Sequence, residues 1–235
     1  MNNRINKITT IIFIIMAIIF SISAAIIIPI LFRPFYYACI KIFDIEKTTG
    51  YSYHQIKTAF DEMMDFIWAG KPFRTGDLAF SYEGMCHFRD CIFLFWLDLI
   101  CFMVSLLYMC IHIKLVRNKI ISFYNFFGFH PYFYSGIITV LFVLTIVIIA
   151  SIDFYDAFIV FHKLFFPGKD NWEFDPDKDE IVRILPEGFF ALCAGWIGAH
   201  ILIFDIAAIS YGIIYKVKHK NHLKGDNNEG SICNQ

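Results

Sequence analysis

Four long apolar runs constrain the fold of this 235-residue chain more than any other feature. A transmembrane helix needs about 20 mostly apolar residues to cross the hydrocarbon core of a bilayer. The composition agrees with membrane insertion, because 58% of the residues are hydrophobic and 17% are charged. Soluble domains are closer to half apolar and a quarter charged. The sequence therefore predicts an all-α membrane protein with transmembrane helices at residues 11–32, 91–115, 133–160 and 188–216.

The first apolar run begins like a secretory signal peptide, because Arg4 and Lys7 precede it and "SISAA" follows part of it. Its apolar character continues to Phe32, well beyond the roughly 7–15 residues of a signal-peptide core. We therefore interpret this run as an uncleaved membrane anchor.

Basic residues indicate which ends of the spans lie in the cytoplasm. The segment Lys114–Pro131 carries three basic residues and no acidic one, and Arg4 and Lys7 are the charges of the N-terminus. Lysines also outnumber acids after Tyr215. Cytoplasmic loops of membrane proteins are enriched in Lys and Arg. The pattern places residues 1–10, 116–132 and 217–235 in the cytoplasm.

Residues 33–90 and 161–187 are net acidic, and we expect them to form an extracytoplasmic, mostly helical cap. Within the first segment, Ser52 followed by Gln55 is a capping-box pattern that starts a helix, and Gly70 is a typical helix end. The apolar positions of this helix fall on one stripe. They are Ile56, Ala59, Phe60, Met63, Met64 and Ile67.

Two further helix starts are visible in the cap. Ser81 is a suitable N-cap for a helix that continues into the second span. Asp179–Leu185 is compatible with a short helix, and Pro186 suits the start of the fourth span.

Two histidines are predicted to lie at the same membrane depth. His87 comes about one helical turn before the second span, and His162 follows the third span on the same side. Asp90 is three residues after His87 on one helix face, where it could fix the tautomer of the ring. Glu187 starts the fourth span at the same level. A single interfacial histidine is commonly a rim residue, but this grouping favours an acid/base site.

The other polar residues near the spans divide by depth. Asp153 and Asp156 lie close enough to the outer boundary to support the site, whereas His112 and His130 belong to the cytoplasmic side. Cys91, four residues after His87, could reach that ring, although a small membrane-entry residue is the simpler interpretation.

Five aromatic residues crowd the segment around His162: Phe161, Phe165, Phe166, Trp172 and Phe174. Membrane proteins commonly carry aromatic belts at the interface. The same side chains could also form an apolar chamber that holds acyl chains over the histidines. We expect both descriptions to apply.

Two stretches resemble the signature regions of the bacterial lipoprotein intramolecular transacylase family. They are "AFSYEGMCHFRDCIFLF" and "DFYDAFIVFHKLFFPGKDNWEFDPDKDEIVRILPEGFF". The resemblance implies four spans, an outer cap and catalytic His87 and His162. It also implies the reaction, in which the sn-2 acyl chain of a diacylglyceryl-cysteine lipoprotein moves to the free α-amine and gives the lyso form. No metal or cofactor is required. The resemblance does not decide which histidine is the base and which the acid.

Two other classes of function stay open from the residues alone. One is a metal-dependent membrane hydrolase with His87, Asp90, His162 and Glu187 as ligands, although no HExxH-type spacing supports it. The other is a transporter or accessory subunit with polar groups inside the bundle. Those groups are Asp98, Asp153, His200 and Asp205. The sequence also leaves open whether Cys39 and Cys86 pair in the cap.

Overall fold

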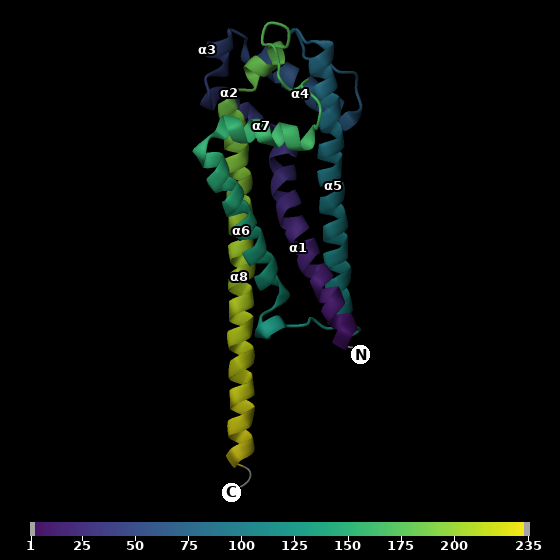
Figure 1. Ribbon diagram of the computed structural model, residues 1–235, viewed down its shortest axis with the longest axis vertical. Helices are drawn as coiled ribbons and strands as arrows, with labels where there is room; N and C mark the ends of the chain where they lie inside the picture. The colour runs from purple at the N-terminus through teal and green to yellow at the C-terminus, as the bar shows by residue number, and fades with distance from the viewer. Residues whose placement is uncertain (1–2, 233–235) are drawn as a thin grey trace. The chain divides into compact units, whose positions relative to one another are not determined.

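The computed structural model describes residues 3–232, with side chains through residue 220, and these residues form helices joined by loops (Figure 1). The described elements are α1 (Asn3–Leu31), α2 (Arg33–Ile42), α3 (Ile45–Thr49), α4 (Tyr53–Ala69), α5 (Tyr82–Arg117), η1 (Phe126–Gly128), α6 (Pro131–Ile152), α7 (Phe154–Phe165), η2 (Glu180–Ile184) and α8 (Glu187–Ile232). The all-α prediction is confirmed. The outermost parts of the two predicted cytoplasmic ends, residues 1–2 and 233–235, lie outside the described residues.

Four of these helices are long and apolar enough to cross a membrane: α1, α5, α6 and α8. They correspond to the four predicted spans. The helix α5 has 36 residues, which at 1.5 Å per residue makes it about 54 Å long, well over the roughly 30 Å of a hydrocarbon core. The predicted second span and the end of the cap segment before it therefore form one continuous helix.

The predicted third span divides into two helices at Asp153. The helix α6 ends at Ile152 and α7 begins at Phe154, because Asp153 adopts an extended backbone with φ −151°. Its carboxylate accepts a hydrogen bond from the Asp156 amide at 3.0 Å and so caps α7. The helix α7 then runs crosswise to the start of α5 (Figure 1). His162 consequently lies within a separate helix and not directly after a span.

The described chain forms two compact units. One comprises the residues up to 24, residues 101–145 and those from 199 onward. The other comprises residues 25–100 and 146–198 and contains both predicted cap segments.

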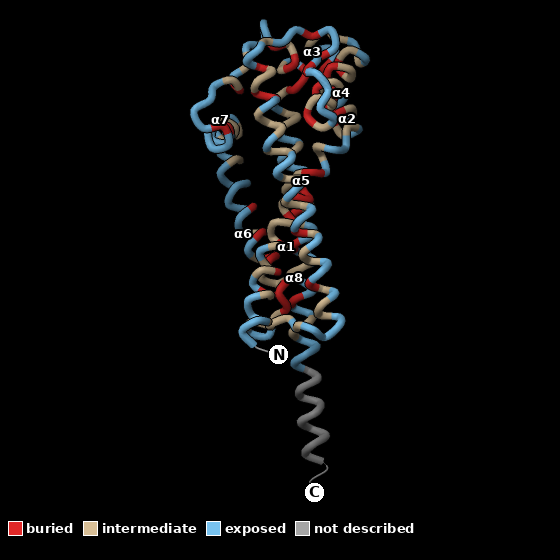
Figure 2. The backbone as a smooth tube through the Cα atoms, turned by 90° about the vertical axis from the view of Figure 1, so that its right-hand side faces the viewer, coloured by how far each residue is buried: buried red, intermediate tan, exposed pale blue. Residues whose placement is uncertain are grey.

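The second unit has an apolar core built by the cap helices, and its buried positions are concentrated there (Figure 2). The predicted capping box of Ser52 and Gln55 is present and α4 ends at Gly70, as expected. The buried residues of α4 are the six of the predicted stripe. The predicted short helix is confirmed as η2.

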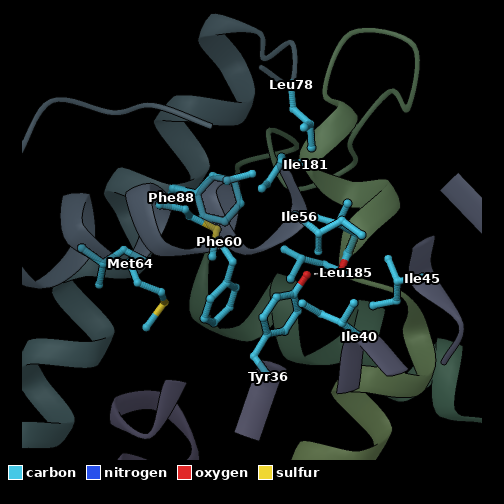
Figure 3. Close-up of a cluster of buried hydrophobic side chains, with 14 of the residues drawn as sticks. Tyr36, Ile40, Ile45, Ile56, Phe60, Met64, Leu78, Phe88, Ile181 and Leu185 are labelled. Carbon is cyan, nitrogen blue, oxygen red and sulfur yellow. Dashed lines mark hydrogen bonds between the residues drawn. The ribbon is translucent and has the colours of Figure 1, made fainter. Parts of the chain in front are cut away.

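Tyr36 is a fully buried member of this core (Figure 3). Its ring stacks on Phe60 with centroids 3.7 Å apart, and its hydroxyl donates a hydrogen bond to the Ile184 carbonyl at 2.7 Å. This contact joins α2, α4 and η2, so the two cap segments share one core although Tyr36 and Ile184 are 148 residues apart.

The first unit is held by aromatic and polar contacts between its helices. Phe13 of α1 contacts the rings of His112 and Phe123 at 4.9 Å. The Ser21 hydroxyl donates a 2.6 Å hydrogen bond to the buried carboxylate of Asp205. Asp205 therefore joins α1 to α8, a packing role that suits a polar group inside a span.

Candidate active site

The structure brings His87 and His162 together. Their ring centroids are 5.7 Å apart with the planes tilted by 38°. Each side chain is only 6% exposed. His87 comes from the first turns of α5 and His162 from α7. Two imidazoles at this separation can act on one bound molecule.

Aromatic rings enclose the pair. Trp172 stacks on His162 at 4.8 Å, and Phe166 contacts both histidines, at 5.0 Å from His87 and 5.8 Å from His162. Phe174 meets His87 edge-on at 5.5 Å. Phe166 and Trp172 are themselves buried. Aromatic side chains therefore surround both imidazoles.

The tautomer of His162 follows from its hydrogen bond. Its Nδ1 lies 2.8 Å from the Phe158 carbonyl oxygen, one turn earlier in α7. A carbonyl only accepts, so Nδ1 carries the proton and the neutral ring has its lone pair on Nε2. Burial lowers the pKa of His162 below its usual value, and the Phe158 carbonyl acts in the opposite direction. The neutral form of the His162 ring is therefore favoured at pH 7.

His87 has one weak partner and one free nitrogen. Its Nε2 lies 3.5 Å from the Cys91 sulfur, the i+4 neighbour on α5. Its Nδ1 is buried and finds no hydrogen-bond partner within the described residues. Buried polar atoms in native proteins are nearly always bonded, so an unpaired one in an enclosed site indicates a place for a substrate group.

Asp90 does not hold His87 as the sequence suggested. Its Oδ1 pairs with the Lys169 ammonium at 2.6 Å, and its Oδ2 accepts a hydrogen bond from Asn171 Nδ2 at 3.1 Å. Both partners belong to the loop that follows α7. Asp90 thus ties this loop, with Phe166 and Trp172, to α5 one turn after His87.

A second carboxylate ties the other end of the same loop to α5. Asp179 is 4% exposed and accepts hydrogen bonds from the Ser81 amide at 2.8 Å and the Ser81 hydroxyl at 2.9 Å. The Ser81 hydroxyl also caps α5 by accepting from the Gly84 amide at 2.9 Å, as predicted for this serine. Gly84 lies so close to Asp179 and Phe174 that a methyl group would overlap the Asp179 carboxylate and come within 3.0 Å of a ring carbon of Phe174. The loop and the start of α5 are therefore tightly packed.

The comparison with protein families decides between the open interpretations. The family model "Lipoprotein intramolecular transacylase Lit" matches residues 11–190. The chain belongs to this transacylase family. Its four apolar helices make it a multi-pass membrane protein. No curated protein sequence matches the chain significantly.

Solved structures of a transacylase relative share the fold. The membrane-integral transacylase Lit from Bacillus cereus is 24% identical, with a TM-score of 0.82 over 94% of this chain and 100% of that one. A form of the same enzyme with a histidine replaced by arginine is 25% identical, with a TM-score of 0.72 over 93% and 95% of the two chains. A histidine-to-alanine form is 23% identical, with a TM-score of 0.75 over 93% and 96%.

In this transacylase, the remaining predicted site residues lie at the edge of the histidine site or outside it. Glu187 is exposed at the start of α8. Asp153, the N-cap of α7, and Asp156 in its first turn are also exposed, and their negative charges favour the helix N-terminus. Phe161 and Phe165 are 48% and 46% exposed and contact each other at 4.7 Å. Phe161 also reaches the His162 ring at 5.4 Å. These two phenylalanines lie on the exposed side of α7.

Four residues of the site were not predicted as such from the sequence: Phe158, Lys169, Asn171 and Asp179. Phe158 could have been found by helical spacing, because it is four residues before His162 and their rings lie 4.0 Å apart. The partners of Asp90 and Ser81 lie about 80 to 100 residues away. No local pattern signals pairs of that separation.

The alternative metal-ligand set does not converge. Both oxygens of Asp90 are bonded to the loop, and Glu187 is exposed. Among the side chains that the structure describes, no three His, Cys, Asp or Glu residues are grouped closely enough to bind one ion. Cys39 and Cys86, whose pairing the sequence left open, are both free thiols.

Proposed function

We propose that this chain moves the sn-2 acyl chain of a diacylglyceryl-cysteine lipoprotein to the α-amine of the same cysteine, giving the lyso form. The observation that carries the proposal is the contact between two buried histidines, 5.7 Å apart, inside aromatic walls. Membership of the transacylase family supports it. An ester-to-amide transfer needs a base for the amine and an acid for the departing oxygen, and two imidazoles supply both.

We assign the base to His162. Its Nδ1 is occupied by the Phe158 carbonyl, so its Nε2 is free to accept a proton from the attacking amine. An α-amine has a pKa of about 8, so a neutral imidazole is a sufficient base. The new amide bond forms as the amine nitrogen attacks the ester carbonyl, and the proton passes to His162.

We assign the acid to His87. When the Cys91 thiol donates to Nε2, the proton of the neutral ring is on Nδ1, the nitrogen with no protein partner. The proton that His162 takes from the amine passes to His87, which becomes an imidazolium and gives its Nδ1 proton to the glyceryl oxygen as the ester bond breaks. One proton leaves the amine and one reaches the alcohol, so both rings end neutral and the overall reaction is balanced without a cofactor.

The aromatic walls would contribute mainly geometry and dryness. Nucleophile and ester belong to one molecule, so the enzyme has to hold them in contact, an effect that can lower a barrier by several kcal/mol. Phe166, Trp172 and Phe174 would also exclude water, which would otherwise hydrolyse the ester. The exposed Phe161 and Phe165 would meet lipid at the mouth of the site.

The proposed substrate fixes the proposed orientation. Diacylglyceryl lipoproteins with a free amine are displayed outside the cytoplasmic membrane, so the histidine site and the cap would face outward. The basic segments would then lie in the cytoplasm with both termini, as the charge distribution predicts. The partners would be these lipoproteins and membrane lipid, with no nucleic acid.

Mass spectrometry of a reporter lipoprotein tests the proposal in cells that lack other N-acylating enzymes. The wild-type chain should give the lyso form, and His87→Ala and His162→Ala should each give none. His54→Ala is the matched control, because His54 is exposed on α4 and away from the pair. Lyso product from both alanine variants at the wild-type level would refute the assignment.

A further inference from the structure

One polar group beside the histidines has no function in the proposed mechanism. The Asn171 side-chain oxygen is buried and has no hydrogen-bond partner within the described residues, whereas its nitrogen donates to Asp90 at 3.1 Å. A buried carbonyl oxygen without a donor is uncommon in native proteins and needs an explanation. The neighbouring unpaired atom, His87 Nδ1, is explained by the departing glyceryl oxygen. Asn171 requires a different substrate group.

The orientation of the amide is determined by its surroundings. The two ends of an asparagine amide are alike in shape, so the hydrogen-bond partners decide which end is nitrogen. Asp90 is a carboxylate, since it pairs with Lys169 at 2.6 Å, and a carboxylate only accepts. The amide nitrogen therefore faces Asp90, and the oxygen is left as an acceptor for another molecule.

The position of Asn171 links the two histidines. Asp90, which holds it, lies three residues after His87 on α5. Trp172, the next residue in the loop, stacks on His162. Asn171 is therefore held between residues that adjoin both rings, Asp90 on the helix of His87 and Trp172 against His162.

We propose that the Asn171 oxygen binds the α-amine of the lipoprotein's N-terminal cysteine, with Asp90 as the positioning residue that turns the amide. The inference rests on the proposed function and adds a binding residue to it. Of the reacting groups only the amine has N–H bonds; the ester oxygens and the thioether sulfur are acceptors, which this oxygen cannot bind. Because Lys169 already pairs with the Asp90 carboxylate, the Asn171 oxygen would supply the contact to the amine, and Asp90 would only hold the amide in place.

Binding measurements with two unreactive lipopeptides test this. Both probes carry two ether-linked alkyl chains, so no acyl group can move; one has the cysteine α-amine and the other has hydrogen in its place. The purified full chain in detergent should bind the amine probe about tenfold more tightly, the usual effect of one hydrogen bond to a charged or strongly polar group. Asn171→Leu, which keeps the size of the side chain, should bind both probes with the same Kd.

Two further variants separate recognition from structure. Asp90→Asn keeps the Asn171 side chain but no longer selects which way its amide points, because the new amide at position 90 can both donate and accept. The preference of this variant for the amine probe should therefore fall below the wild-type ratio. Asp177→Asn is the matched control, since Asp177 pairs with Arg183 at 2.8 Å in the same loop while its side chain is 89% exposed. This control should keep the tenfold ratio.

A tenfold preference retained in Asn171→Leu overturns the inference, as does an equal weakening of both probes with the ratio intact. If Asn171→Leu does not fold, Asp90→Asn decides, and an unchanged ratio there also overturns it. Formation of lyso product from an ester-linked lipopeptide, measured with the same wild-type preparation, distinguishes failure of the proposed function from failure of the Asn171 proposal. No lyso product would refute the proposed function, whereas normal turnover with an unchanged ratio would refute only the role of Asn171.

Discussion

Gly84→Ala is a sharp test of how the loop after α7 is packed against α5. A new methyl group would overlap the Asp179 carboxylate and approach a ring carbon of Phe174 to 3.0 Å. Both neighbours are constrained, because Asp179 holds two hydrogen bonds from Ser81 and Phe174 contacts the rings of His87 and Phe88. The substitution should therefore destabilise the protein and disturb the site at once.

The magnitude can be worked from opposing terms. Alanine in place of a helical glycine favours the helix by up to about 1 kcal/mol. Overpacking a filled site costs about 1–3 kcal/mol, and weakening the cap that Asp179 and Ser81 provide costs about 1 kcal/mol more. The balance is a loss of about 1–3 kcal/mol, or several degrees in Tm for a chain of this length.

Thermal unfolding in detergent and lyso-product formation measure the two effects in Gly84→Ala. Gly195→Ala is the matched control, because Gly195 is also helical and has nothing within 4 Å of the position a methyl group would take. This control should have an unchanged or higher Tm and normal activity. Equal Tm values for the two variants at one scan rate would refute the packing argument.

Three other substitutions test the fold. Tyr36→Phe should lower Tm by several degrees at a cost of about 1–3 kcal/mol, because it leaves the buried Ile184 carbonyl without its donor; an unchanged Tm would contradict this. Ser52→Ala should cost about 1 kcal/mol in the same assay by removing the capping box with Gln55, and a loss under a few tenths would contradict it. Burial lowers the pKa of His130 from 6.5 to about 4. Between these two pH values the unfolded chain binds more protons than the folded chain, so the stability should fall as the pH drops through this window. His130→Phe should flatten that dependence of Tm on pH, and equal slopes in both proteins would refute it.

Local patterns in the sequence were sufficient wherever a structure depends on residues close in the chain. The capping box at Ser52, the glycine end at Gly70 and the stripe of α4 follow from helix geometry alone. The division at Asp153 was missed although Asp153 and Asp156 have the spacing of a helix start. The apolar residues on both sides of Asp153 suit one span as well as two helices, so hydropathy gave no sign of a turn in direction.

The sequence predicted only those features of the site that follow from the membrane topology. The common depth of His87 and His162 follows from where the apolar runs end, and the 5.7 Å contact of their rings agrees with it. The role of Asp90 could not be derived, because its helical neighbour His87 competes with two partners about 80 residues away. A lysine ammonium and an amide are better partners for a carboxylate than a neutral ring.

The placement of the charged groups suggests why the site can work with so few polar atoms. Asp90 and Asp179 anchor the loop after α7 to α5 at two points, so Phe166, Trp172 and Phe174 are held against His87 as one piece. The Phe158 carbonyl fixes His162 within its own helix. The side chains that contact the two imidazoles are mainly aromatic: Phe158, Phe166, Trp172 and Phe174. A rearrangement within one molecule needs little more, because bringing amine and ester together is the larger part of the barrier. Replacing a residue that anchors the loop should therefore reduce the rate more than replacing the exposed Phe161 or Phe165.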